Sequence, residues 1–175
     1  MKQQLLRPDQ IITLADFPVH HAQCLKIYFK IFQNGYGRIV PPVPVLHKSI
    51  GLPLAKGSGK KAEAYNALLL GFLEQHPKAE YFLLDGSHRT TAAALCHKKM
   101  PVMVFERDAD IREAKKRVER GELFSLTVGG DSIEEAIKAL EEHFFKEQVF
   151  QTVAEKTERM VREKVLPKYM ISFYS

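Results

Sequence analysis

The sequence predicts an α/β fold in which a small sheet, built from the first part of the chain, is followed by helices alone. Short apolar runs alternate with amphipathic helical segments as far as Phe105, and this alternation is typical of α/β folds. After Glu106 the strand-like runs stop and only helical patterns follow. The pattern does not decide whether the sheet is wholly parallel or mixed.

Apolar spacing, proline and glycine predict the first elements. A strand is expected at residues 10–14, followed by a helix that ends at Asn34-Gly35 and whose apolar residues recur at helical spacing (Leu25, Tyr28, Phe29 and Phe32). Prolines at 41, 42 and 44 favour extended chain, so a strand is expected at 43–47. A loop over 51–61 then precedes a second helix, which carries an apolar stripe and ends at His76-Pro77.

The remaining elements follow from the same signals. An apolar run predicts a buried strand at 81–84, after which a turn at 85–89 leads into an alanine-rich helix at 90–97 and a strand at 101–105. Farther on, a charged helix is expected at 111–120. Ser132 and Glu135 have the spacing of a capping box that opens another helix, and a last helix is expected at about 150–165.

Composition and charge narrow the functional classes. The apolar runs are too short for a transmembrane helix, and two cysteines exclude a disulfide framework, so we expect a cytoplasmic protein without a membrane partner. The net charge is +5, and no acidic residue occurs between Phe17 and Lys61, a stretch that holds seven lysines and arginines. Such a block favours an anionic partner, although an ordinary solvated basic surface gives the same pattern.

The turn after the third predicted strand carries the strongest chemical signal. A buried strand there delivers a polar turn onto a helix N-terminus, where free amides and the helix dipole favour an anion. The expected phosphate-binding residues are Gly86, Ser87, His88, Arg89 and Thr90. Asp85 is the candidate Mg²⁺ ligand or general base, and His88 the candidate proton carrier. A plain Asp-Gly turn with a helix cap is the alternative interpretation.

The ordered string from Leu84 to Ala93, together with the strand that opens at Pro101-Val102, resembles the signature of the ParB/sulfiredoxin superfamily. The resemblance covers about residues 8–106. It implies a small mixed sheet with packed helices in a domain of residues 1–107, with a helical insertion at about 50–77 and a C-terminal helical extension at 108–175. It also implies a nucleotide-phosphate site in the turn, with ATP, ADP or CTP as the nucleotide.

Members of this superfamily differ in chemistry, and the sequence discriminates among them. Sulfiredoxins carry a reactive cysteine where this chain has Ser87, so reduction of sulfinic acids is not expected. ParB proteins continue into a basic DNA-binding region, whereas residues 124–165 here are net acidic, so DNA binding is expected to be weak or absent. The turn is most similar to that of the archaeal free serine kinases. These use a glutamate base near their first helix, for which this chain offers Asp16, His20 or His21.

Two functional hypotheses follow. The first is a Mg²⁺-dependent phosphotransferase or nucleotide hydrolase, a small-molecule kinase if the acceptor is small, with Asp85 and His88 as catalytic residues. The second is a non-enzymatic ParB-like module that binds nucleotide or DNA. A basic loop at Lys56, Lys60 and Lys61 is a candidate lid over the phosphates, or a plain flexible loop. The pattern leaves the oligomeric state open.

Overall fold

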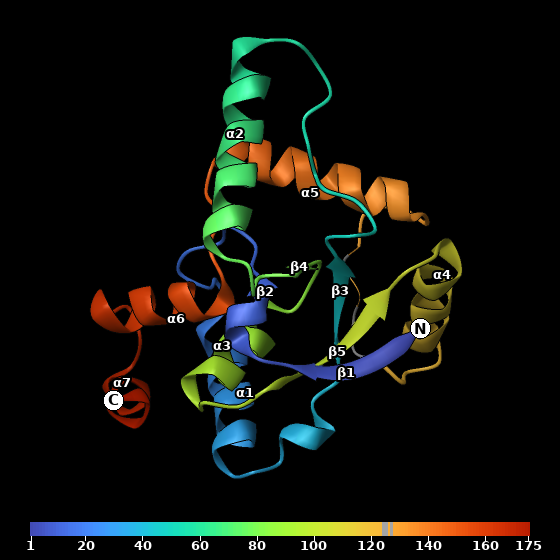
Figure 1. Cartoon of the computed structure of the whole chain (residues 1–175). Helices are drawn as coiled ribbons and strands as arrows, with labels where there is room; N and C mark the ends of the chain where they lie inside the picture. Colours follow the sequence, from blue (N-terminus) through green and yellow to red (C-terminus); the bar gives the residue numbers. More distant parts are fainter. Residues whose placement is uncertain (124–125, 127) are drawn as a thin grey trace.

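The computed structural model describes residues 1–123, 126 and 128–175, and these form a mixed α/β fold. Its sheet has five strands in the described residues, in the order β1-β5-β3-β4-β2 (Figure 1). The strands are β1 (Lys2–Leu6), β2 (Ile11–Ile12), β3 (Val43–His47), β4 (Tyr81–Leu83) and β5 (Met100–Phe105). The β1–β5 and β3–β4 pairs are antiparallel, whereas the β3–β5 and β2–β4 pairs are parallel, so the sheet is mixed.

Helices cover both faces of this sheet. In the described parts of the chain they are α1 (Ala22–Gln33), α2 (Lys60–Gln75), α3 (Ser87–Leu95), α4 (Asp108–Glu119), α5 (Ile133–Glu147), α6 (Val153–Arg162) and α7 (Lys168–Tyr174), with short 3₁₀ turns η1 (Pro8–Gln10) and η2 (Gly37–Ile39). None of the helices in these ranges is long and apolar enough to cross a membrane.

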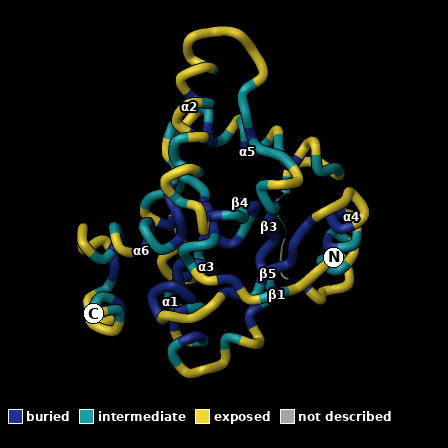
Figure 2. The backbone as a smooth tube through the Cα atoms, viewed as in Figure 1, coloured by how far each residue is buried: buried dark blue, intermediate teal, exposed yellow. Residues whose placement is uncertain are grey.

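The apolar core has two layers, one on each face of the sheet (Figure 2). Along β5, Val102 and Val104 belong to one layer, and Met103 and Phe105 belong to the other, as the two-residue period of a strand requires. Helices α1, α3, α6 and α7 contribute to the first layer, and α2, α4 and α5 to the second. The helices that follow residue 107 therefore complete both layers of the core.

Most predicted elements are confirmed, and four differ. The strand expected at 10–14 is only Ile11–Ile12, and α3 begins at Ser87 because Gly86 already caps it. Strand β1 was not predicted because its polar sequence KQQLL lies at the edge of the sheet and buries only Leu6. Helix α7 was also not predicted, since Pro167 marks a helix end in the sequence but serves here as an N-cap.

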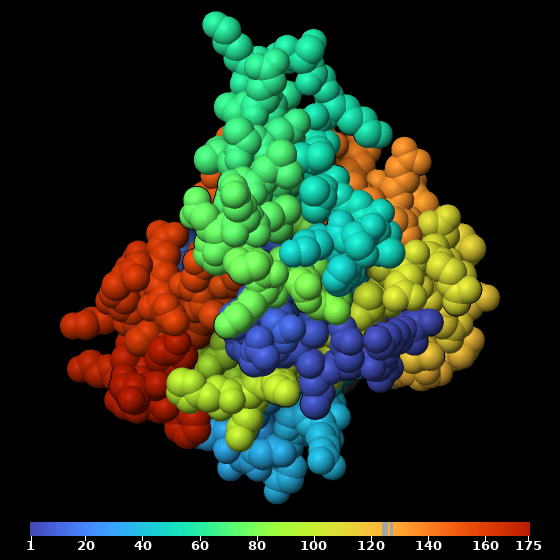
Figure 3. All heavy atoms as spheres, viewed as in Figure 1, coloured from blue at the N-terminus to red at the C-terminus, as the bar shows by residue number. Residues whose placement is uncertain are grey.

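The segment expected as a helical insertion forms α2 and the loop before it, which project from the sheet at the top of Figures 1 and 3. Tyr65 and Leu69 anchor α2 in the second core layer. The three lysines of the expected lid are exposed at this end, and two of them contact α5: Lys61 lies over the Phe145 ring at 4.8 Å, and Lys56 lies 3.9 Å from Glu134. In the view of Figure 1 this end points away from α3.

A histidine–carboxylate pair joins the end of α2 to the start of α6. The Nε2 atom of His76 lies 2.8 Å from Oε1 of Glu155. Burial lowers the pKa of His76, but hydrogen bonds to the Phe72 carbonyl and to Glu155 outweigh this, so the pKa is raised overall. A raised histidine pKa stabilises the fold below the unfolded value of about 6.5, and this stabilisation is lost as the pH rises through the folded value.

We therefore predict that His76→Gln lowers the melting temperature more at about pH 6 than at about pH 8.5. Thermal unfolding followed by circular dichroism at both pH values measures the difference. His20→Gln, at an exposed histidine, is the control. An effect of His76→Gln that does not change with pH would contradict the prediction.

Candidate functional site

The connection between β4 and α3 consists of three residues, Leu84, Asp85 and Gly86. Gly86 has φ 104°, in the left-handed region, and a Cβ atom there would collide with the Val43 side chain on the neighbouring strand. Only glycine fits this turn, which brings the backbone of the chain directly onto the start of α3. No side chain caps α3, and its first turn has no acidic residue, so no side-chain cap occupies its N-terminal amides.

The parallel pairing of β2 and β4 places a second carboxylate, in addition to that of Asp85, beside this turn. Strands β2 and β4 are parallel neighbours, so the chain leaves both at the same edge of the sheet. The segment after β2 carries Asp16, and its Oδ1 atom accepts a hydrogen bond of 3.1 Å from the Ser87 hydroxyl. Asp16, one of the three residues expected to replace the base of the free serine kinases, is therefore in contact with the predicted phosphate turn.

Lys156 from α6 completes this cluster. Its Nζ atom lies 2.5 Å from Oδ1 of Asp16, and the lysine side chain is fully buried. Burial lowers the pKa of Lys156, and the charge and hydrogen bond of Asp16 oppose this effect. Helix α6 reaches this place because the residues before it extend the sheet: Thr152 bridges to Ile12, and the Thr13 amide donates to the Gln151 carbonyl at 3.0 Å.

Two histidines fix the segment that carries Asp16. The Ala15 amide donates to Nε2 of His143 on α5 at 2.9 Å, and the His21 amide donates to Nε2 of His88 on α3 at 3.1 Å. Burial lowers the pKa of both histidines, which favours the neutral ring that these acceptor roles require. Since Nε2 of His88 accepts, its proton is on Nδ1, and that N–H is a donor for a ligand oxygen.

The structure uses Arg89 and Thr90 inside the fold. The Arg89 guanidinium is only 7% exposed and donates from Nη1 to the carbonyls of Pro41 and Pro42 at 3.1 and 3.3 Å. The Thr90 hydroxyl donates to backbone carbonyls of its own helix. Arg89 thus ties the chain before β3 to the turn, and its guanidinium carries positive charge to the site from within the protein.

Asp85 lies two residues after the end of β4, with its Oδ2 atom 3.8 Å from Nη2 of Arg89. Within residues 1–123, 126 and 128–175, no group of three metal-ligating side chains occurs. Mg²⁺ is commonly held by one or two carboxylates together with substrate phosphates and water. Asp85 fits that role as a single protein ligand, and any further ligands would come from phosphate and water.

A small cavity of about 210 Å³ adjoins this region. It is lined by Leu14, Leu84 and His143, among others, so the segments that carry Asp16 and Asp85 both border it. The remaining wall is apolar and comes largely from α5.

Sequence reasoning singled out Asp85 to Thr90 and considered Asp16, but it missed Lys156 and His143. Both lie on helices far along the chain, in segments whose charges and spacing are those of ordinary amphipathic helices. Comparison with protein-family models, with curated proteins and with solved structures finds no match for this chain.

We predict strong energetic coupling between Lys156 and Asp16. Lys156→Met leaves a partly buried carboxylate without its cation and should destabilise the fold by about 3–5 kcal/mol. Adding Asp16→Asn removes the unpaired charge, so the double variant should be more stable than the sum of the two single changes implies. Denaturant unfolding of the four proteins measures the coupling, and additive losses would show that the pair contributes little.

We predict that Arg89→Ala destabilises the fold, because it leaves the Pro41 and Pro42 carbonyls without their donor and empties a buried volume. Chemical denaturation should show a loss of about 2–4 kcal/mol. Arg7→Ala, at a half-exposed arginine, is the control and should change stability by about 0.5 kcal/mol or less. An Arg89→Ala protein as stable as the wild type would leave ligand binding as the role of this arginine.

Proposed function

We propose that this chain is a ParB-like nucleotide-binding protein that transfers or hydrolyses a phosphoryl group at the N-terminus of α3. The observation that carries the proposal is the cluster of Asp16, Ser87 and Lys156 beside a helix start that no side chain caps. The resemblance to the free serine kinases supports it, since an acidic residue before the first helix lies next to the turn. The likeness consists of the similar turn sequence and of an acidic residue that lies beside the turn.

Each group has a distinct role in this proposal. The amides of Ser87 and His88 and the Nδ1–H of His88 would hold phosphate oxygens, and the tight turn at Gly86 allows their close approach. Asp16 would orient, and accept a proton from, an acceptor hydroxyl or water through its second oxygen, while Lys156 holds its first. Arg89 would add charge stabilisation from behind the turn. Mg²⁺, if held by Asp85 and the phosphates, would neutralise charge on the phosphoryl group.

The alternative is a module that binds nucleotide without turnover. It is favoured by one specific observation: Oδ1 of Asp16 already accepts hydrogen bonds from the Ser87 hydroxyl and the Lys156 ammonium, so the carboxylate has a structural role in the fold. In this alternative, Asp16, Ser87 and Lys156 hold the turn in place. The binding of a nucleotide would then alter the conformation of the segment at residues 15–21. DNA would then be at most a weak, salt-sensitive ligand.

A thermal-shift panel of ATP, ADP, CTP and GTP, each with and without Mg²⁺, tests the proposal. We predict that one nucleotide raises the melting temperature, because a ligand that binds only the folded state stabilises it. Asp85→Asn should keep this shift but lose its Mg²⁺ dependence, and its turnover should fall by orders of magnitude. Asp131→Asn, at an exposed carboxylate far along the chain, is the control.

Asp16 is tested in the Asp16→Asn/Lys156→Met background, in which both charges are removed together. This double variant should bind nucleotide but not turn it over if Asp16 is the base. Turnover equal to that of the wild type would exclude the base role. No turnover of any nucleotide by the wild type, with binding retained, would support the module, and no thermal shift at all would overturn both.

A further inference from the structure

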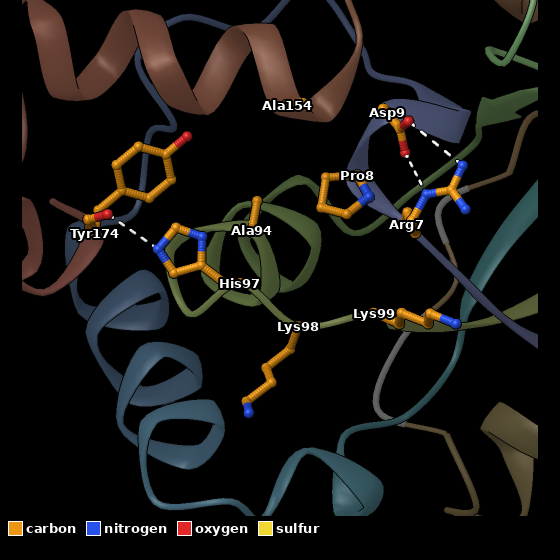
Figure 4. A pocket seen from close by; sticks show the side chains of 9 residues that line it. All are labelled: Arg7, Pro8, Asp9, Ala94, His97, Lys98, Lys99, Ala154 and Tyr174. Carbon is orange, nitrogen blue, oxygen red and sulfur yellow. Dashed lines mark hydrogen bonds and ion pairs between the residues drawn. The ribbon is translucent and has the colours of Figure 1, made fainter.

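A second hollow lies at the opposite end of α3 from the turn. Its volume is about 400 Å³, and its walls come from η1, the end of α3, α6 and α7 (Figure 4). The residues that line it are Arg7, Pro8, Asp9, Ala94, His97, Lys98, Lys99, Ala154 and Tyr174. This volume lies within the range of pockets that hold small organic ligands.

The floor of this cavity is apolar and made of small residues. Pro8, Ala94 and Ala154 come from three different elements, and their short side chains leave the space between those elements open. Figure 4 shows Pro8 and Ala94 at the centre of the hollow, with His97 and Tyr174 along one side. Such a surface suits the apolar body of a ligand rather than a bare ion.

One wall is a rigid aromatic pair. The His97 and Tyr174 rings are stacked, with centroids 4.9 Å apart and planes inclined by 21°. Nε2 of His97 donates a hydrogen bond of 3.0 Å to the Tyr174 carbonyl oxygen. This contact fixes the imidazole ring as a flat surface beside the floor.

The rim is positively charged. Lys98 and Lys99 are exposed, and no carboxylate in the described residues pairs with either. Asp9 is the single acidic residue of the lining, and it is bound by Arg7 at 3.0 Å. The lining thus has a surplus of two positive charges, both on side chains at the mouth of the cavity.

Capping of the helix does not account for the two lysines. Cationic residues often follow a helix because they interact with its last carbonyls. Here backbone amides already bind those carbonyls: Cys96 donates to Ala92, His97 to Ala94, and Lys98 to Ala93. The ammonium groups of Lys98 and Lys99 are therefore available to a ligand.

We propose that this cavity binds a small phosphomonoester with a planar body, independently of the turn at the other end of α3. The phosphate lies at the rim, where the Lys98 and Lys99 side chains, which point away from each other in Figure 4, must turn toward it; their long, flexible stems allow this. The planar body covers Pro8 and Ala94 and packs against the His97–Tyr174 pair. The apolar floor distinguishes this cavity from a merely basic surface, which would attract any polyanion.

Phenyl phosphate is the probe, with inorganic phosphate and benzoate as partial ligands, each titrated calorimetrically into the whole chain at constant ionic strength. We expect phenyl phosphate to bind more tightly than either partial ligand. Lys98→Ala/Lys99→Ala should weaken its binding at least tenfold. Lys78→Ala/Lys116→Ala removes the same charge from exposed positions elsewhere and should change binding less than twofold.

A second variant distinguishes the contribution of the cavity to binding from that of the two lysines. Ala154→Leu fills the floor, leaves both lysines in place, and should also weaken phenyl phosphate binding at least tenfold. Binding that survives Ala154→Leu but not the loss of the lysines would identify a charged surface for polyanions such as nucleic acid, and would overturn the proposal. Failure of phenyl phosphate to bind the wild type at millimolar concentration would also overturn it.

Amide chemical shifts locate the ligand without any variant. Addition of phenyl phosphate should shift the amide signals of Ala94, His97 and Tyr174 and leave those of Gly86 and Ser87 unchanged. The reverse pattern would place the ligand at the turn and overturn the inference. The Asp16→Asn/Lys156→Met protein should bind phenyl phosphate as the wild type does, so that failure of the nucleotide site and failure of this one are distinguished.

Discussion

The ammonium group of Lys156 is removed from water, and its charge partner within the described residues is the Asp16 carboxylate. Burying a lysine costs free energy that an ion pair offsets only when its geometry is good, so such pairs contribute less to stability than apolar packing of the same volume. What the pair does provide is position. It joins α6, a helix of the C-terminal region, to the segment between β2 and α1, and it orients Asp16 toward Ser87 at the start of α3.

The consequences of this pair extend to both ends of the chain. Helix α6, which brings Lys156 to Asp16, packs against α3, and its Val153 and Met160 belong to the first core layer. The guanidinium of Arg159, one turn farther along, lies 3.8 Å from the centre of the Phe17 ring, which anchors the residue after Asp16. The C-terminal helices are therefore part of the same packing unit as the sheet and the candidate site.

The sequence predicted four of the five described strands and the principal helices because each of these has a local cause. The apolar spacing of α1, the prolines before β3 and the capping box of α5 all act within a few residues, and each element is where it was expected. The site was predictable only where it is local, at the Asp85 turn. Lys156 and His143 could not be found in this way, because only the tertiary fold brings them to residues more than a hundred positions earlier.

Arg89 shows the same limit of local sequence patterns, here for a residue that the sequence did single out. An arginine at a helix start is equally compatible with phosphate binding and with bonding to backbone carbonyls, and the sequence favoured the first. The two prolines that predicted the strand at β3 also supply the carbonyls that Arg89 binds. A carbonyl that precedes a proline or belongs to an extended segment has fewer backbone partners, so a buried arginine satisfies it.

Charge balance links this arrangement to the candidate function. A phosphate at the start of α3 would lie near two carboxylates, and uncompensated repulsion from them would oppose its binding. Each carboxylate has a cation on its protein side: Lys156 pairs with Asp16, and Arg89 lies beside Asp85. No acidic residue lies between Phe17 and Lys61, the stretch that includes α1 and β3 beside the turn. The helix amides and the proton of His88 would therefore act on an anion without a net negative background, a condition that favours phosphate binding.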